Sequence, residues 1–335
     1  MRSLQRAGLL AILGLVGLPA AVEAHGIAAA PPSDILGFLS LWSFDPFVQV
    51  PLMATAVAYV SAVRSVNRAH PANPVPLRRG VAFLAGLAAI ELALQSPIEH
   101  YDTTLFSDHM LQHVLLTMIA APLIAAGGPI TLALRFARPD IRRRWLIPIL
   151  HSRIVKAVSF PVVAWILFAG VMWGSHFSPL FNASLEDPGI HQFEHIAYLV
   201  AALLFWWPVV GVDPSPWRMP HPLRVLYTFL QMPQNTFLAL AIFSSTTPLY
   251  AHYATQIRNW GPSVLDDQQL AGGLMWIVGD LTFLVAILFL VASWMRQEDR
   301  DTARTDARGD AERVEIGRRE AILADRLARE RTNDR

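Results

Sequence analysis

The stretch DHMLQHVLLTMIAAPLIAAGGP, residues 108–129, decides the fold. Two histidines, His109 and His113, stand four residues apart at the start of an apolar run that continues to Ala126. Such a run is close to the roughly 20 apolar residues that a helix needs to cross a bilayer. The stretch therefore predicts a transmembrane helix with two imidazoles on one face, near one of its ends.

The whole chain has the composition of a membrane protein. Of its 335 residues, 53% are hydrophobic and only 16% are charged, which is too apolar for a soluble protein of this length. The chain contains no cysteine, so disulfides and thiolate metal sites are excluded. Its net charge of +1 gives no reason to expect nucleic acid as a partner.

Seven apolar runs predict an all-α, polytopic bundle of seven transmembrane helices. In lipid every backbone polar group must be bonded within the protein, which leaves helices or closed barrels, and runs of this length favour helices. The lipid bilayer is therefore one expected partner. The runs cover residues 46–63, 80–97, 108–126, 156–174, 191–211, 223–246 and 270–294.

Residues 1–24 have the pattern of a cleavable signal peptide. Arg2 and Arg6 precede a short apolar run, and the triplet VEA ends at Ala24 as a cleavage site. The run is short of the length of a span, which favours cleavage after Ala24. An uncleaved first transmembrane helix is the alternative.

Basic residues predict the orientation, because cytoplasmic loops are enriched in Lys and Arg. Two connections between predicted spans, residues 64–79 and 135–156, are rich in arginine, as is the tail after Trp294. Connections on the opposite face contain neither Lys nor Arg over residues 98–107 and 175–190. We therefore expect a bacterial inner-membrane protein with a periplasmic N-terminus and a cytoplasmic C-terminus.

These features divide the chain into four expected parts. A signal peptide precedes a periplasmic segment, the transmembrane domain and a charged cytoplasmic tail. In the tail Arg, Asp and Glu dominate, which predicts a solvated, partly amphipathic helix. The boundaries are residues 1–24, 25–45, 46–295 and 296–335.

Eight of the eleven histidines fall on the predicted outer face. Two pairs, His109 with His113 and His191 with His195, each place two rings on one face of a helix. Both pairs lie in the outermost turns of their helices, so they are at matched depth. Interfacial histidines that bond lipid headgroups are the alternative, but ionisable residues in a membrane mark functional sites by default. The other outer histidines are His25, His100, His176 and His252.

The donor set indicates copper first and haem iron second. Imidazole suits copper, zinc, iron and nickel. Met110 and Met172 add thioethers that favour Cu(I), although methionine is also a common packing residue. The expected metal ligands are His109, His113, His191, His195, His176, His100 and His25.

Several acidic residues accompany these histidines. Carboxylates beside metal-binding imidazoles fix their tautomers, and Asp102, Asp108, Glu99 and Glu194 are placed to do so. Carboxyl groups also occur deeper in the predicted bundle, where burial is costly. These are Glu91 and Asp280, which we expect to be protonated, paired or part of a polar path.

Three stretches resemble the integral-membrane CtaG family of cytochrome c oxidase assembly factors. They are FSDHMLQHVLLTMIAAPLIAAGGP from Phe106, GIHQFEHIAYL from Gly189 and DDQQLAGGLMWIVGDL from Asp266. The segments SPIEHYD and PLYAHY fit the same pattern. The resemblance implies a seven-span protein needed to mature the copper-containing oxidase. It carries over His109, His113, His191, His195 and Asp280.

We therefore expect an assembly factor rather than an enzyme. It would hold copper at the outer face and deliver it to a copper-containing oxidase subunit, its expected partner; homo-oligomerisation is left open. A membrane haem or copper oxidoreductase is one alternative, although the chain has no CxxCH motif. A copper permease is another, with a path along Glu91 and Asp280 beside a sixth helix interrupted at Pro233.

Overall fold

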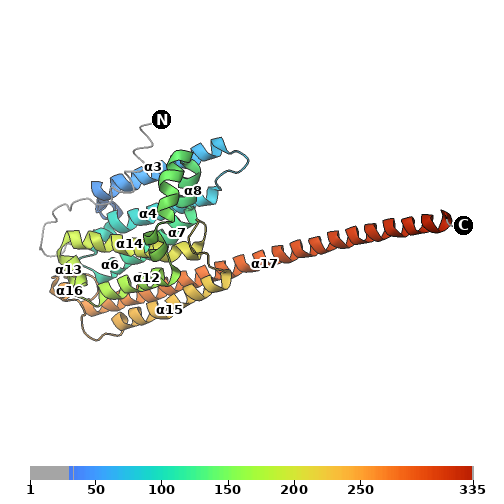
Figure 1. The fold of residues 1–335 in the computed structure, drawn as a ribbon. Coiled ribbons are helices and arrows are strands. Elements are labelled where there is room, and N and C mark those ends of the chain that lie inside the picture. Colours follow the sequence, from blue (N-terminus) through green and yellow to red (C-terminus); the bar gives the residue numbers. More distant parts are fainter. Residues whose placement is uncertain (1–29, 33, 334–335) are drawn as a thin grey trace. The chain divides into compact units, whose positions relative to one another are not determined.

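The computed structural model describes residues 30–32 and 34–333, and every regular element in that part of the chain is a helix (Figure 1). The all-α class predicted from the sequence is confirmed. The predicted signal peptide, its cleavage after Ala24 and the proposed ligand His25 all lie outside the described residues.

The first four helices are set by capping residues and prolines. Asp34 caps α2 (Ile35–Ser40), and Asp45 caps α3 (Pro46–Ala69). Then α4 (Leu77–Gln95) stops at Ser96, whose hydroxyl caps α5 (Pro97–Tyr101) by accepting from the Ile98 backbone N–H. Pro97 cannot donate a helical hydrogen bond to α4, so the chain turns there.

Residues 106–127, which include most of the stretch that opens the sequence analysis, form one long helix that contains a π-helical segment. It comprises α6 (Phe106–Val114), the π-helical segment η1 (Leu115–Ala120) and α7 (Ala121–Gly127). Pro122 lacks the N–H that regular α-helical bonding would need, which is a common reason for such a segment. Gly128, at φ +65°, ends α7 in the left-handed conformation that glycine tolerates best, and α8 (Pro129–Phe136) follows.

Short helices cover the arginine-rich connection that follows. They are α9 (Pro139–Ile141), η2 (Arg142–Leu146), α10 (Ile147–Leu150) and α11 (Arg153–Val158). The chain then forms α12 (Pro161–His176) and α13 (Leu180–Glu186), which meet at an angle of 69°.

The second half of the chain contains the longest described helix, α17 (Val264–Asn333). Asp187 caps α14 (Pro188–Val210) through the backbone N–H groups of Gly189 and Ile190. It is followed by α15 (His221–Phe243), α16 (Ala251–Thr255) and α17 (Val264–Asn333).

Among the described residues, five helices are long and apolar enough to cross a membrane, or six if the bent pair α12 and α13 counts as one span. The chain therefore has the helices of a multi-pass membrane protein, whereas the predicted number of seven spans is not confirmed in the part of the chain that the structure describes. Of the predicted spans, α12 qualifies only together with α13, and α15 does not qualify because Gln231, Gln234 and Asn235 lower its hydropathy. The five are Pro46–Ala69, Leu77–Tyr101, Phe106–Phe136, Pro188–Val210 and Val264–Ala321.

The chain divides into two compact units, with the boundary between Val285 and Ala286. In the second unit, described by itself, the helix continues to Asn333, and its charged side chains are exposed over 296–321. Arg313 pairs with Asp310 at 2.7 Å, one helical turn away. Such exposed pairs add only a few tenths of a kcal/mol each.

In the first unit α14 packs between the α6–η1–α7 helix and α12, and α15 contacts both α12 and α14 (Figure 1). Small residues allow close approach: a side chain at Gly86 of α4 would lie 2.8 Å from Ile124 of α7. Similarly, a side chain at Gly272 of α17 would lie 2.8 Å from the Phe243 backbone. This packing brings together side chains that are far apart in the sequence.

Candidate metal centre

Five buried histidines from three helices converge in the first unit. The ring centroids of His109 and His113 on α6 are 4.4 Å apart, and those of His191 and His195 on α14 are 4.2 Å apart. The two pairs face each other across the helix interface. The centroid distances across it are 5.2 Å for His109 to His191 and 5.9 Å for His113 to His195.

The fifth histidine is the last residue of α12. The ring centroid of His176 lies 6.3 Å from that of His113. None of the five residues is more than 9% exposed, so the group is closed to solvent. We call these five the histidine cluster.

Two carboxylates lie among the imidazoles. An oxygen of Glu194 on α14 is 3.8 Å from Nε2 of His109, and an oxygen of Asp102, between α5 and α6, is 3.5 Å from Nε2 of His191. Two groups thus form in which all ligand atoms lie within 4.8 Å of one another, and His109 belongs to both. They are Asp102 with His109 and His191, and Glu194 with His109 and His113.

Eight buried polar atoms of these residues have no hydrogen-bond partner. They are both ring nitrogens of His109 and of His113, Nε2 of His191, one oxygen of Asp102 and both oxygens of Glu194. Leaving one such atom unpaired costs about 1–3 kcal/mol. A cation would engage several of these lone pairs at once, so nitrogen and oxygen donors at these positions fit a metal ion.

The electrostatic environment of Asp102, in the connection before α6, also fits a bound cation. Burial raises the pKa of Asp102 well above its usual range, and the nearby carboxylate of Glu99 raises it further. Both causes disfavour negative charge. A metal ion beside Asp102 would oppose them by its positive charge.

Gln112 orients one ligand of the cluster. Its amide nitrogen donates to the Ala93 carbonyl at 3.0 Å and to the Glu99 carboxylate. That fixes the amide oxygen toward His195, whose Nε2 donates to it at 2.9 Å. With its proton on Nε2, His195 keeps the lone pair on Nδ1.

Hydrogen bonds also hold His176 in place. Its Nδ1 lies 2.7 Å from the Met172 carbonyl and 3.1 Å from the Tyr198 hydroxyl. Tyr198 in turn bonds Ser175 and packs its ring against His113, with centroids 4.1 Å apart.

The π-helical segment begins two residues after His113, and side chains bond its backbone. The Thr117 hydroxyl donates to the His113 carbonyl at 2.7 Å, and the Trp206 indole donates to the Thr117 carbonyl at 2.9 Å. At the other end Asp267 of α17 accepts from the backbone N–H of Phe106 at 2.7 Å. These contacts fix the rotation and start of the helix that carries the first pair.

Several residues predicted for the site lie elsewhere. His100 is exposed, and its ring packs edge-on against Tyr101. His252 bonds the Thr103 carbonyl at 2.8 Å, so it braces the connection before α6. Asp108 is half-buried on α6 and belongs to neither carboxylate–histidine group.

The two deeper carboxylates have partners of their own. Glu91 on α4 accepts from the Gln49 amide at 2.9 Å once that amide is turned to face it. Asp280 on α17 accepts from Thr236 at 2.6 Å and from Asn235 at 3.1 Å. The structure therefore pairs each carboxyl group locally.

Sequence reasoning missed one contributor, Gln112, and expected two others, Asp102 and Glu194, in a different position. Gln112 was not singled out, although a fully buried amide between two histidines on an apolar helix is a usable signal. Asp102 and Glu194 were expected behind the imidazoles. The structure places both within the two candidate ligand groups.

Comparison with known proteins gives one family and several relatives. The family described as cytochrome c oxidase caa3 assembly factor (Caa3_CtaG) matches residues 57–297. Uncharacterized proteins of Mycobacterium bovis and Mycobacterium tuberculosis are each 32% identical over 294 residues. An uncharacterized protein of Mycobacterium leprae is 32% identical over 293 residues.

These alignments cover most of this chain but less than half of each relative. They take in 86%, 86% and 85% of the chain, and 44% of the relative in each case. No solved structure matches the chain. The matched region contains every residue of the histidine cluster.

Proposed function

The chain belongs to the cytochrome c oxidase caa3 assembly factor family, and from this membership we propose that it holds copper in the histidine cluster and delivers it to the oxidase. Membership implies a membrane protein that assists assembly of the oxidase rather than an enzyme. The finer steps, copper binding and hand-over to a copper-containing subunit, are our proposal.

One observation carries the proposal: eight buried nitrogen and oxygen atoms without hydrogen-bond partners belong to five residues of one small region. Imidazole nitrogen binds copper well, and for a given nitrogen and oxygen site Cu²⁺ is favoured over the other divalent first-row ions. An oxidase assembly factor has a use for copper as cargo. The chemistry of the donors and the family thus support the same metal.

His109 is central to this proposal because it belongs to both ligand groups. In one group it would share the ion with Asp102 and His191, and in the other with His113 and Glu194. Copper bound there is the cargo to be handed over. Gln112 and Tyr198 would act as positioning residues for His195 and His176.

The test measures copper in the purified full-length chain in detergent. The metal-free protein is incubated with Cu(II), freed of excess metal and analysed for copper content and absorption. We expect bound copper and no haem absorption in the Soret region. The variant His109→Gln should lose most of the copper, whereas His70→Gln, at an exposed loop histidine, should retain it.

Three outcomes would count against the proposal. Wild-type protein without copper would end it, and a preference for Zn(II) over Cu(II) would assign a different metal. A Soret band in the purified protein would favour the haem alternative. In cells that lack the gene, His109→Gln should fail to restore copper to the oxidase, and full restoration would separate the cluster from assembly.

A further inference from the structure

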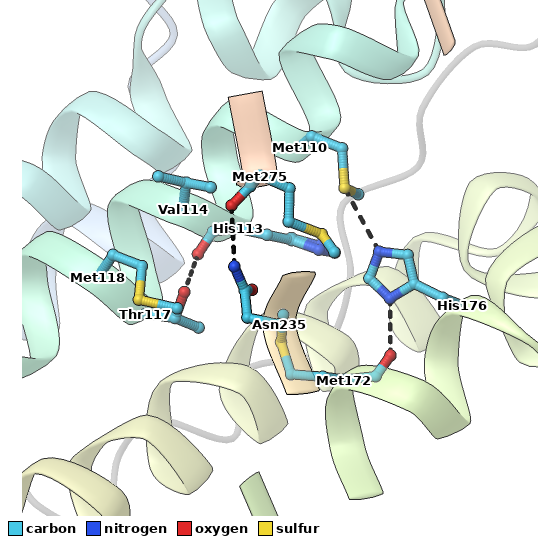
Figure 2. Close-up of a pocket in the computed structure, with 9 residues that line it drawn as sticks. All are labelled: Met110, His113, Val114, Thr117, Met118, Met172, His176, Asn235 and Met275. Atoms are coloured by element: carbon cyan, nitrogen blue, oxygen red, sulfur yellow. Dashed lines mark hydrogen bonds between the residues drawn. The ribbon is translucent and has the colours of Figure 1, made fainter. Parts of the chain in front are cut away.

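A small cavity lies beside the histidine cluster, and methionine is its main lining residue. Its volume is about 10 Å³, which is room for one water-sized particle. Four of the nine methionines of the chain line it. Figure 2 shows the full lining, which is Met110, His113, Val114, Thr117, Met118, Met172, His176, Asn235 and Met275.

The four methionines come from four elements, and all are buried. Met110 lies on α6, Met118 on η1, Met172 on α12 and Met275 on α17. Their exposed fractions are 4% or less. Methionine often fills gaps in a core, so convergence of thioethers alone does not identify a site.

The contact between His176 and Met110 is the observation that favours a binding site over simple core packing. Nδ1 of His176 lies 2.7 Å from the Met172 carbonyl, which can only accept, so the ring proton belongs on Nδ1. Nε2 then carries a lone pair and faces the sulfur of Met110 at 3.3 Å (Figure 2). Both atoms are acceptors, and neither donates to the other.

A cation would join these two acceptors. Among metal ions, thioether sulfur selects soft ions such as Cu(I) over hard ions, and imidazole is compatible with them. The rest of the lining is largely apolar, and an apolar cavity disfavours a hydrated divalent ion. The donors and their surroundings thus point to the same class of ion.

We propose that this methionine cavity is a second metal site, specific for a soft monovalent cation, Cu(I). The sulfur of Met110 and Nε2 of His176 are its central ligands, and Met172 and Met275 are within the same lining. The inference extends the proposed function, since it adds a site for reduced copper beside the cluster.

His113 connects the two sites. It lines the cavity and also belongs to the group with His109 and Glu194. Neither of its ring nitrogens has a hydrogen-bond partner. This imidazole therefore borders both regions, as does that of His176, which belongs to the histidine cluster and lines the cavity.

The absence of cysteine makes the test direct. Because the chain has none, copper–sulfur scattering in an X-ray absorption spectrum of the Cu(I)-loaded protein can come only from methionine. We expect this scattering in the full-length protein. A spectrum with nitrogen and oxygen neighbours only would overturn the proposal.

Binding of Ag(I), a soft monovalent ion without redox chemistry, provides the second measurement. Met110→Leu keeps the size of the side chain but removes the sulfur, and we expect Ag(I) affinity to fall about tenfold or more. Met53→Leu is the matched control, because Met53 is 54% exposed on α3. Equal Ag(I) affinity for Met110→Leu and wild type would refute the site.

Cu(II) binding to the same variants separates this inference from the proposed function. Met110→Leu should leave Cu(II) binding intact, and this result also shows that the variant is folded. Wild-type protein that binds Ag(I) at Met110 but no Cu(II) would support the methionine cavity and refute the histidine cluster as a Cu(II) site. The opposite pattern would refute only the cavity.

Discussion

The histidine cluster and the methionine cavity lie on two faces of one helical turn. His109 and Met110 are neighbours in the chain, so their side chains leave the helix about 100° apart. The first points to nitrogen and oxygen donors of α14, and the second points to thioethers of α12 and α17. A single helix can thus separate hard from soft ligands.

His113 lies between the two faces for the same geometric reason. It is four residues from His109 and three from Met110, and both spacings bring side chains together on a helix. The comparison indicates that the two regions should respond to different ions but share two residues, His113 and His176. Four predictions test that division, from the largest expected effect to the smallest.

Replacing His113, one of the two shared residues, should affect both regions. We expect His113→Ala to lower the affinity for Cu(II) and for Ag(I), each by about 100-fold, since it removes a ligand and not only its support. Competition with chelators of known affinity measures both. If only one ion is affected, His113 belongs to one region and the proposed connection is wrong.

Removing a charge should affect the histidine cluster alone. Glu194→Gln keeps the shape of the side chain but removes its charge, so Cu(II) affinity should fall about 10–100-fold while Ag(I) affinity stays the same. Glu186→Gln is the control, because Glu186 is an exposed acid at the end of α13. A parallel loss of Ag(I) binding would contradict the separation of the two faces.

Gln112→Leu should have an intermediate effect, because Gln112 acts through His195. Without the amide, Nε2 of His195 and the Glu99 carboxylate lose a partner. We expect about tenfold weaker Cu(II) binding and a loss of about 1–3 kcal/mol in the free energy of unfolding. Binding and thermal unfolding of the same sample measure both. Lower stability with unchanged Cu(II) affinity would reduce Gln112 to a purely structural role.

The smallest effect is expected at a residue that the sequence placed among the ligands. His100 is exposed and packs on Tyr101, so His100→Gln should leave copper content unchanged. Elemental analysis of the loaded protein checks this. A loss as large as that of His109→Gln would restore His100 as a ligand and extend the cluster toward α5.

Predictions from the sequence were most successful for features that lie within a single helix. The two HxxxH pairs were recognised because residues four apart share one face of a helix. The length of the apolar runs likewise identified most of the helices that could span a membrane. The exception is α15, whose hydropathy is lowered by polar residues such as Asn235 and Thr236, which bond Asp280 of α17.

Residues that act through long-range contacts were harder to recognise. His195 and Gln112 are 83 positions apart, and Met110 and His176 are 66 apart. Their meeting depends on how α6, α12 and α14 pack, which no local pattern encodes. For the same reason His100, three residues from Pro97, turned out to lie on the exposed side of a short helix.

The sequence by itself determined the helical class, the membrane character, the absence of thiolate chemistry and the two histidine pairs, because composition and helical periodicity are local properties. Only the tertiary structure decided that the pairs face each other, that Asp102 and Glu194 lie among them and that Met110 faces His176. Those facts depend on helix rotation and depth, which are set by close packing at small residues, by the π-turn after His113 and by caps such as Asp267.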